Sequence, residues 1–243
     1  DIGGGTSDFS VIRVGPQLRR RLDRKGDVLA NHGVHVAGTD FDRQVELAAI
    51  LPLCGYRSLG PAQKGRAPRE VPSRVYFDLA TWHLINSVYA PQRRHELRQM
   101  RSYYADLRQH ERLMRVIEDR QGHALLGQAE AAQIAVAEGG ATQIALDRIE
   151  AGLQSSADQA QVVQALDAQL EAIAGAARET LRLAGVQPGQ VDVMYFTGGS
   201  TGFEPLVRRI AAEAPAAQVI HGDRHASVAT GLGVYARMLF GNP

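Results

Sequence analysis

Apolar and polar positions alternate as in strands near both ends of the chain. Near the N-terminus, residues 8–14 and 28–36 alternate with a period of two, which predicts two antiparallel strands joined by turns. Near the C-terminus, the apolar run 191–196 has the length of a strand and follows a strongly periodic helix predicted over 157–184. The remaining predicted elements are helix 204–213, strand 218–220 and helix 225–240. This alternation of helices and strands indicates a covered sheet with at least partly parallel pairing.

The middle of the chain has the period of helices instead. A helix is predicted to begin near residue 39, and residues 52–72 form a surface loop rich in glycine, proline and basic residues. Apolar residues three and four positions apart then predict a long helical tract over 73–137, broken at Pro91 and near Gly122. A short strand is predicted over 143–146.

These elements combine into one architecture of the α/β class. We expect residues 1–36 and 150–243 to share one sheet domain, with residues 37–149 inserted as a mainly helical subdomain. Two glycine-rich loops, residues 3–5 and 198–202, belong to the sheet domain. Open α/β sheets bind ligands at the carboxyl ends of their strands, so a cleft between these two loops is expected.

The composition of the chain argues against several classes of function. The 243 residues contain 27 basic and 26 acidic residues, a balance that gives no indication of a nucleic-acid or membrane partner. The single cysteine, Cys54, excludes a disulfide within the chain, fits a reducing compartment and is expected to be a buried, inert thiol. No apolar run has the length of a membrane span and no signal peptide is present, so a cytoplasmic protein is expected.

The first eight residues, Asp-Ile-Gly-Gly-Gly-Thr-Ser-Asp, have the composition of a phosphate-binding loop. Three successive glycines lack Cβ atoms, so their backbone N–H groups can approach an anion closely. Thr6 adds a hydroxyl donor, and Asp1 and Asp8 place carboxylates at the two ends. A strand follows this loop, whereas a helix follows the glycines of a P-loop. Since such a loop normally succeeds a strand, we expect the chain to be a piece of a longer protein.

Three segments together resemble the actin-like ATPase superfamily, which includes DnaK-type heat-shock chaperones, sugar kinases and actin. Residues 1–10 resemble the second phosphate motif of the chaperones, residues 38–42 their entry into the upper subdomain, and residues 196–201 their adenosine motif. Within the helical tract, residues 71–72, 79–86 and 111–118 are similar to the YegD-type divergent relatives of DnaK. The resemblance implies a ribonuclease H-like lobe with a mixed sheet, corresponding to lobe II of the nucleotide-binding domain.

The resemblance also implies a role for each matching residue, with ATP or ADP and Mg²⁺ as cofactors. Asp1 would orient the waters bound to Mg²⁺ near the γ-phosphate, and Asp1 and Thr6 would be the catalytic residues. The expected donors to the β- and γ-phosphates are Gly3, Gly4, Gly5 and Thr6. The expected contacts to adenosine are Gly198, Gly199 and Ser200, with Glu130 on the ribose.

The chain departs from the family pattern on the adenine side. Gln133 stands in place of the lysine that follows the ribose-contacting glutamate, and Ala137 in place of a nearby serine. Gly202 stands where the family has an arginine that stacks on adenine, and His225 where it has an aspartate. Each lost contact is worth about 1–2 kcal/mol. We therefore expect nucleotide affinity on the order of 10²-fold weaker, unless His225 compensates by stacking.

Three hypotheses for function follow. The first is an ATP-binding, chaperone-like protein, with client or co-chaperone partners, of which this chain is one lobe. The parent is then a candidate ATPase, and this chain is expected not to hydrolyse ATP alone because catalysis needs groups from the missing lobe I. The second is a small-molecule kinase or phosphatase of the same superfamily. The third is a nucleotide-independent protein-interaction module that uses its helical insertion.

Overall fold

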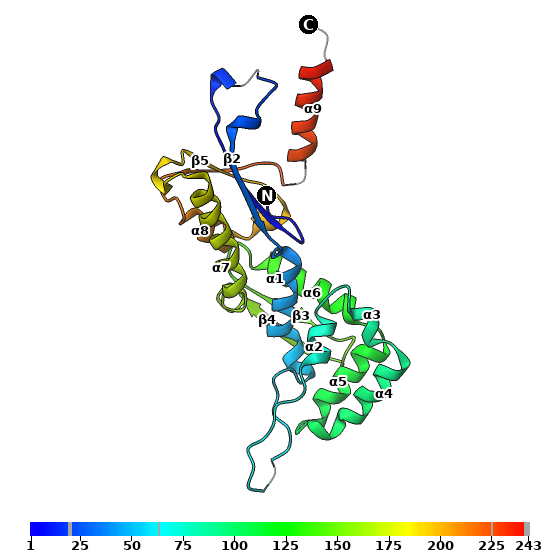
Figure 1. Cartoon of the computed structure of the whole chain (residues 1–243). Coiled ribbons are helices and arrows are strands. Elements are labelled where there is room, and N and C mark those ends of the chain that lie inside the picture. Colours follow the sequence, from blue (N-terminus) through cyan, green and yellow to red (C-terminus); the bar gives the residue numbers. More distant parts are fainter. Residues whose placement is uncertain (19–20, 63, 225, 241–243) are drawn as a thin grey trace. The chain divides into compact units, whose positions relative to one another are not determined.

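The chain is a mixed α/β protein, which confirms the expected class. The computed structural model describes residues 1–18, 21–62, 64–224 and 226–240 (Figure 1). They form two compact units, one made of residues 1–38 with 167–243 and the other of residues 39–166.

The first unit contains two small sheets. Strand β1 (Ser7–Ile12) pairs antiparallel with β2 (Val28–Val34), and the register shifts between Val11 and Ile12. Strand β5 (Val193–Phe196) pairs in parallel with β6 (Gln218–His221), with α8 (Glu204–Ala211) in the connection. The antiparallel and parallel pairings both agree with the sequence pattern.

Among the described residues, the sheet domain expected for residues 1–36 and 150–243 contains two separate sheets, β1–β2 and β5–β6. Ile2 makes backbone hydrogen bonds to the segment that follows β5. Its N–H donates to the Thr197 carbonyl (2.9 Å), and its carbonyl accepts from the Ser200 N–H (3.1 Å). The chain turns back immediately after Ile2, so no longer ladder can form at this position.

Helix α7 (Gln159–Ala184) begins in the second unit and continues into the first. Its residues in the first unit include Leu170, Ile173 and Ala177, which recur at helical spacing and are buried. Phe196 of β5 and Leu206 of α8 are buried in the same unit. These apolar residues give the first unit its own core, as the periodicity of residues 157–184 predicts.

The second unit is mainly helical. Its helices are α1 (Gly38–Val45), α2 (Arg74–Leu79), α3 (Ile85–Val88), α4 (Pro91–Gln99), α5 (Leu107–Glu118) and α6 (Gly122–Ala135), and a π-helical turn (Glu46–Ile50) extends α1. Both predicted breaks in the helical tract are confirmed. Pro91 is the first residue of α4, where its missing N–H costs nothing. Gly122 begins α6, where a Cβ would lie 2.7 Å from both Ile85 Cγ2 and the Tyr89 hydroxyl.

Strand β4 (Gln154–Asp158) is absent from the sequence prediction. It pairs antiparallel with β3 (Ala141–Ala145) and therefore joins the inserted unit. The boundary between the units consequently lies between residues 166 and 167, whereas the sequence places it between 149 and 150. The residues of β4 are Gln-Ser-Ser-Ala-Asp, which lack the apolar alternation that identifies a strand.

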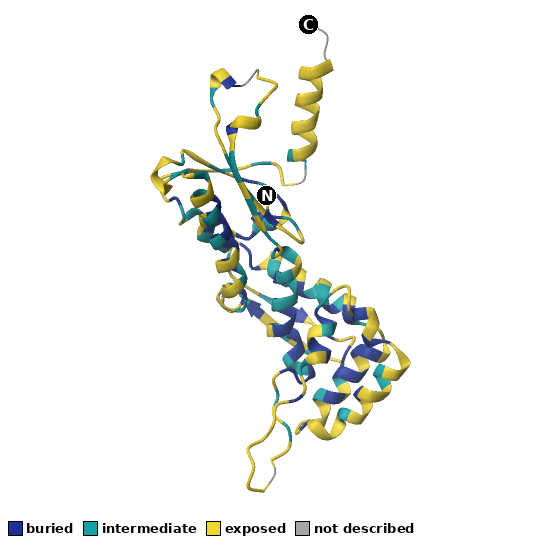
Figure 2. Ribbon diagram, in the orientation of Figure 1, coloured by how far each residue is buried: buried dark blue, intermediate teal, exposed yellow. Residues whose placement is uncertain are grey.

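Burial distinguishes the well-packed parts of the chain from its exposed segments (Figure 2). Cys54 is fully buried in the second unit, and burial raises the pKa of its thiol to about 12, which confirms the expected inert thiol. Helix α9 (Ser227–Phe240) has no buried residue and is exposed from Val228 onward. Among the described residues, no helix combines the length and apolarity needed to cross a bilayer.

Candidate functional site

The first glycine-rich loop is a tight, hydrogen-bonded turn in the first unit. The Asp8 N–H donates to the Asp1 carbonyl (2.8 Å), and the Gly3 N–H donates to the Thr6 carbonyl (3.0 Å). Gly4 and Gly5 lie between these paired residues. The hydroxyl of Thr6, a predicted site residue, donates to Asp8 Oδ2 at the end of the loop (2.8 Å). The turn therefore has a defined shape before any ligand binds.

The fold itself does not require glycine at two positions of this turn. A Cβ built on Gly5 would meet no described atom within 4 Å, and one on Gly3 would meet only the Thr6 carbonyl oxygen at 3.9 Å. Neither glycine has a positive φ. Packing and backbone conformation therefore both tolerate a side chain at Gly5, and its backbone is open to approach from outside. A surface of this kind suits close approach by an anion.

In the second glycine-rich segment, residues 197–202, contacts within the chain explain the residue types. Gly198 has φ +94° and ψ 151°, and a Cβ there would lie 2.3 Å from the Ile2 carbonyl oxygen. The Ser200 hydroxyl donates to the Gly3 carbonyl (2.8 Å), and the buried Thr201 hydroxyl donates to the Gly198 carbonyl (2.7 Å). Gly199 opens the 3₁₀ turn that contains both hydroxyl residues. This segment holds the first loop in place.

The two glycine-rich segments are therefore in direct contact. Gly38 joins the same cluster, since its N–H donates to the Gly3 carbonyl (3.2 Å) and its Cβ would lie 2.6 Å from Ser200 Oγ. Two of the predicted ligand donors, the Gly3 N–H and the Ser200 hydroxyl, are used within the chain. Gly5, at the tip of the turn, has open space around its Cβ position.

Gly202 makes room for a guanidinium that sequence analysis does not identify. A Cβ on Gly202 would lie 2.8 Å from Arg224 Nη1, so the two residues are in close contact. No local pattern distinguishes Arg224 in the sequence, because its position depends on the segment after β6 returning to the 3₁₀ turn. His225, the other predicted residue in this region, lies outside the described residues.

Glu130 lies on α6 in the second unit and is exposed. Burial, and after it the charge of Glu130, raises the pKa of Asp42 to about 7. Glu46, one helical turn after Asp42, is completely buried, and neither of its carboxyl oxygens has a hydrogen-bond partner among the described residues. Burial and the neighbouring Asp42 raise the pKa of Glu46 well above its usual range. Glu130 thus belongs to an acidic cluster of the second unit.

The first loop carries a carboxylate at each end. Asp1 and Asp8 supply carboxylates, while no group of three or more His, Cys, Asp or Glu in the described part of the chain is arranged to enclose a metal. Mg²⁺ usually keeps several waters and binds through one or two carboxylates together with phosphate oxygens.

No protein-family model matches this chain. The function proposed below therefore depends on the geometry of the first loop and on the resemblance of its motifs.

Proposed function

We propose that this chain is one lobe of a two-lobe nucleotide-binding domain of the actin-like ATPase superfamily, in an ATP-binding, chaperone-like protein of the DnaK and YegD type. The single observation that supports this most is the turn at Gly3–Thr6. Backbone hydrogen bonds fix the two ends of this turn. Neither packing nor backbone conformation requires glycine at Gly5, at its tip. A turn with bare backbone, a threonine hydroxyl and flanking carboxylates suits the phosphates of a magnesium nucleotide.

The first loop would act chiefly by positioning. Amides at the tip and the Thr6 hydroxyl donate to phosphate oxygens, and the hydroxyl exchanges its bond to Asp8 for one to the ligand. Phosphoryl transfer depends mainly on such placed donors and on metal charge. In the resembled family, the catalytic lysine and the other metal-orienting carboxylates lie on a different lobe. This chain is therefore expected to bind a nucleotide weakly and not to hydrolyse it alone.

The close contact between Gly202 and Arg224 supports a modified adenine side. The family arginine is missing at position 202, and the absent side chain leaves space that the guanidinium of Arg224 approaches. Arg224 is exposed and supplies the kind of planar cation that stacks on an aromatic base. We assign the base-stacking role to Arg224 in this proposal.

Calorimetric titration of residues 1–243 with MgADP, MgATP and adenosine tests the proposal. MgADP and MgATP are expected to bind, and adenosine is expected to bind much more weakly because it lacks phosphates. Gly5→Val should weaken MgADP binding at least tenfold by blocking the tip amides. Gly189→Val is the matched control, because Gly189 also has open space around its Cβ position and lies on an exposed turn of the same unit.

Two results would contradict this proposal. If Gly5→Val binds MgADP as tightly as the unsubstituted chain does, the first loop is not the phosphate site. Robust Mg²⁺-dependent hydrolysis by residues 1–243 would show that a second lobe is not needed.

A nucleotide-independent protein-interaction module is the second candidate, and a specific observation favours it. The Gly3 N–H and the Ser200 hydroxyl, both expected to contact nucleotide, already have partners within the chain. If no nucleotide produces heat in the titration, the interaction module becomes the better account.

A further inference from the structure

The side chain of Glu46 lies in the interior of the second unit without a partner. Among the described residues, Glu46 alone has a carboxyl group of which both oxygens are buried and make no hydrogen bond. Arg43, three residues earlier, places its guanidinium over the Phe77 ring instead (5.7 Å to the ring centre). An unpaired carboxylate is strongly disfavoured in such an interior, so the carboxyl group of Glu46 keeps its proton in the folded chain.

The groups nearest to Glu46 offer no positive charge. Its own helix contributes Asp42, the following 3₁₀ turn contributes Cys54, and the residue after α3 is Tyr89; each interacts electrostatically with Glu46. A carboxyl, a thiol and a phenol are all neutral or negative. Burial, and after it the charge of Asp42, therefore raises the pKa of Glu46.

The charged groups on the other elements around this cluster are engaged elsewhere. Glu130 of α6 acts on Asp42, and Asp158 of β4 accepts a hydrogen bond from the Gln161 N–H (2.8 Å). Arg112 of α5 pairs with Glu150 (2.6 Å), and Arg120 lies over the Tyr89 ring (5.9 Å to the ring centre). In the part of the chain that the structure describes, no basic side chain forms an ion pair with Glu46.

Glu46 begins the π-helical turn Glu46–Ile50, a rare structure that is frequently found at functional sites. The turn packs against α6, β4 and the 3₁₀ turn Leu51–Cys54. From β4, the Ser155 hydroxyl donates to the Ala49 carbonyl of the turn (2.5 Å). Because these contacts enclose Glu46, water can reach its carboxyl group only if the π-helical turn moves away from them.

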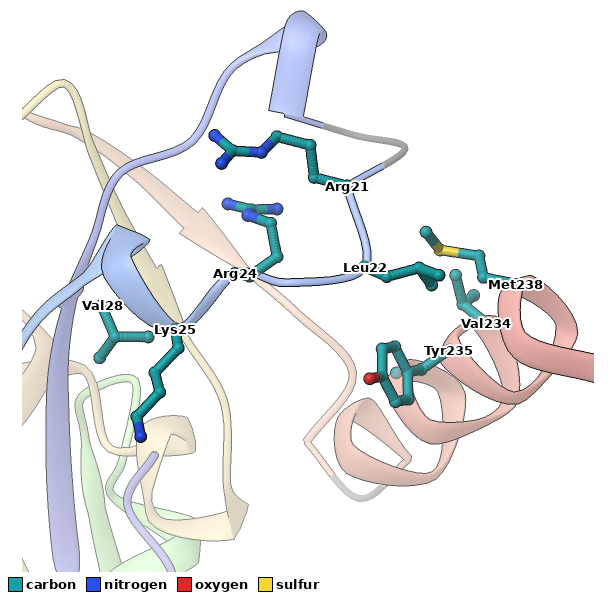
Figure 3. Close-up of a pocket in the computed structure, with 9 residues that line it drawn as sticks. Arg21, Leu22, Arg24, Lys25, Val28, Val234, Tyr235 and Met238 are labelled. Atoms are coloured by element: carbon teal, nitrogen blue, oxygen red, sulfur yellow. The ribbon is translucent and has the colours of Figure 1, made fainter.

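This isolation of Glu46 is a property of the second unit itself, because the chain's own residues bury the carboxyl group. A second lobe bound outside the unit cannot supply the missing partner. Exposed apolar side chains differ in this respect. In the first unit, Leu22 and Met238 line an open groove of about 530 Å³ between α9 and residues 21–28 (Figure 3), and another lobe can cover such a surface.

We propose that Glu46 is a pH-dependent switch in the second unit: its protonated carboxyl group keeps the π-helical turn packed, and loss of the proton releases the turn. The ionised group has no partner inside the unit and gains water when the turn opens. The closed turn holds the proton more tightly than the open turn does. The closed form is therefore most stable below the ordinary glutamate pKa of about 4.5 and loses stability as pH rises toward the raised pKa.

Hydrogen–deuterium exchange of residues 1–243, followed by mass spectrometry at pH 6 and pH 8, tests the proposal without nucleotide. Release of one proton allows opening to increase up to about tenfold per pH unit. After correction for the intrinsic dependence of exchange on pH, we expect exchange at residues 46–54 to increase at least tenfold. Peptides from residues 170–184 of α7, in the first unit, are the internal control and should not change.

Variants of Glu46 assign the effect. Glu46→Leu fills the same space with apolar atoms, so its exchange at residues 46–54 should change less than threefold between the two pH values. Glu46→Gln keeps the shape of the side chain but cannot ionise, and the same result is expected. Glu138→Gln is the matched control because Glu138 is an exposed carboxyl of the same unit, and it should keep the full dependence on pH. Circular dichroism verifies that each variant is folded.

The contribution of Asp42 is separated in a double variant. Asp42→Asn should keep part of the dependence on pH, because burial is a larger cause of the raised pKa of Glu46 than Asp42 is. Adding Glu46→Leu to Asp42→Asn should abolish what remains.

Three results would overturn the proposal. The first is exchange at residues 46–54 that does not depend on pH in the unsubstituted chain. The second is the same dependence on pH in Glu46→Leu and Glu46→Gln as in the unsubstituted chain. The third is an equal increase in the α7 peptides, which would indicate unfolding of the whole chain and not release of one turn.

Discussion

The two glycine-rich segments of the first unit contain glycine for opposite reasons. At Gly198 a left-handed φ of +94° and the Ile2 carbonyl, 2.3 Å from the Cβ position, leave no room for a side chain. At Gly5 the backbone is unstrained and the space around the Cβ position is open. The fold therefore explains the second segment without a ligand. Of Gly5 and Gly198, Gly5 is the one that the fold does not require, and this difference separates a structural role from a possible contact with an external ligand.

The largest expected effect is on stability, at Gly198. Gly198→Ala would combine an unfavourable backbone conformation with a clash against the Ile2 carbonyl, so we expect a loss of at least about 3 kcal/mol in the free energy of unfolding. Urea denaturation followed by circular dichroism measures this loss. Gly185→Ala is the control, since Gly185 has φ +65° but no atom near its Cβ position, and about 1 kcal/mol is expected there. Equal losses in the two variants would contradict the role of the clash.

The next effect concerns ligand affinity beside the second segment. Arg224→Ala removes the guanidinium that lies against Gly202, and we expect MgADP affinity to fall about tenfold, or about 1.4 kcal/mol, while stability stays unchanged. Calorimetry and denaturation of the same variant separate the two quantities. Arg208→Ala is a suitable control because Arg208 is an exposed arginine on α8. If Arg224→Ala binds MgADP like the parent sequence, Arg224 is not the stacking residue.

The second unit offers a comparable contrast between a partly buried carboxyl group, that of Asp42, and exposed carboxyl groups. The pKa of Asp42 rises from its ordinary value of 3.8 to about 7 in the folded chain, so the folded state holds this proton more tightly than the unfolded state does. Stability should therefore fall as pH rises from about 4 to about 7 and change little from this source above that range. Thermal unfolding between pH 5 and pH 8 measures the trend.

Asp42→Asn should reduce this dependence on pH, and Glu130→Gln should move it to lower pH by removing a neighbouring negative charge. Part of the dependence remains in both variants because the pKa of Glu46 is also raised. Glu138→Gln is the control, since Glu138 is an exposed carboxyl of the same unit. An unchanged pH profile in Asp42→Asn would exclude Asp42 as a source of the trend.

The smallest expected effect is on stability at Gly5, and it completes the comparison. Gly5→Ala should change the free energy of unfolding by no more than about 0.5 kcal/mol, because the new methyl group meets nothing. The same denaturation experiment used for Gly198→Ala measures it. A loss as large as that of Gly198→Ala would show that the fold needs glycine in both segments.

Strong periodicity made much of the fold predictable. The alternation around Phe9 and Val11 located β1, and the apolar spacing through Leu170 and Ile173 located α7. Strand β4 was not predictable, because its polar residues become a strand only through pairing with β3. The division of the first unit into two sheets was not predictable, since no sequence pattern shows that the pairing around Ile2 stops after one residue.

The candidate site was predictable in part. The turn at Gly3–Thr6 was evident from its composition, and the structure brings Thr6 and Asp8 together. The contact of Arg224 with Gly202 and the isolation of the Glu46 carboxyl depend on tertiary packing, which single-sequence patterns do not report. The resemblance to nucleotide-binding chaperones stays a prediction, and the titrations above test it.

The burial of Cys54 has a practical consequence for experiments on the two units. It is the one thiol in the sequence, it lies in the second unit, and its raised pKa keeps it in the unreactive protonated form. A thiol reagent added to the native chain should therefore label only molecules whose second unit has opened. The labelling rate then reports how often the second unit opens. Opening of the first unit gives no signal, and no cysteine has to be introduced.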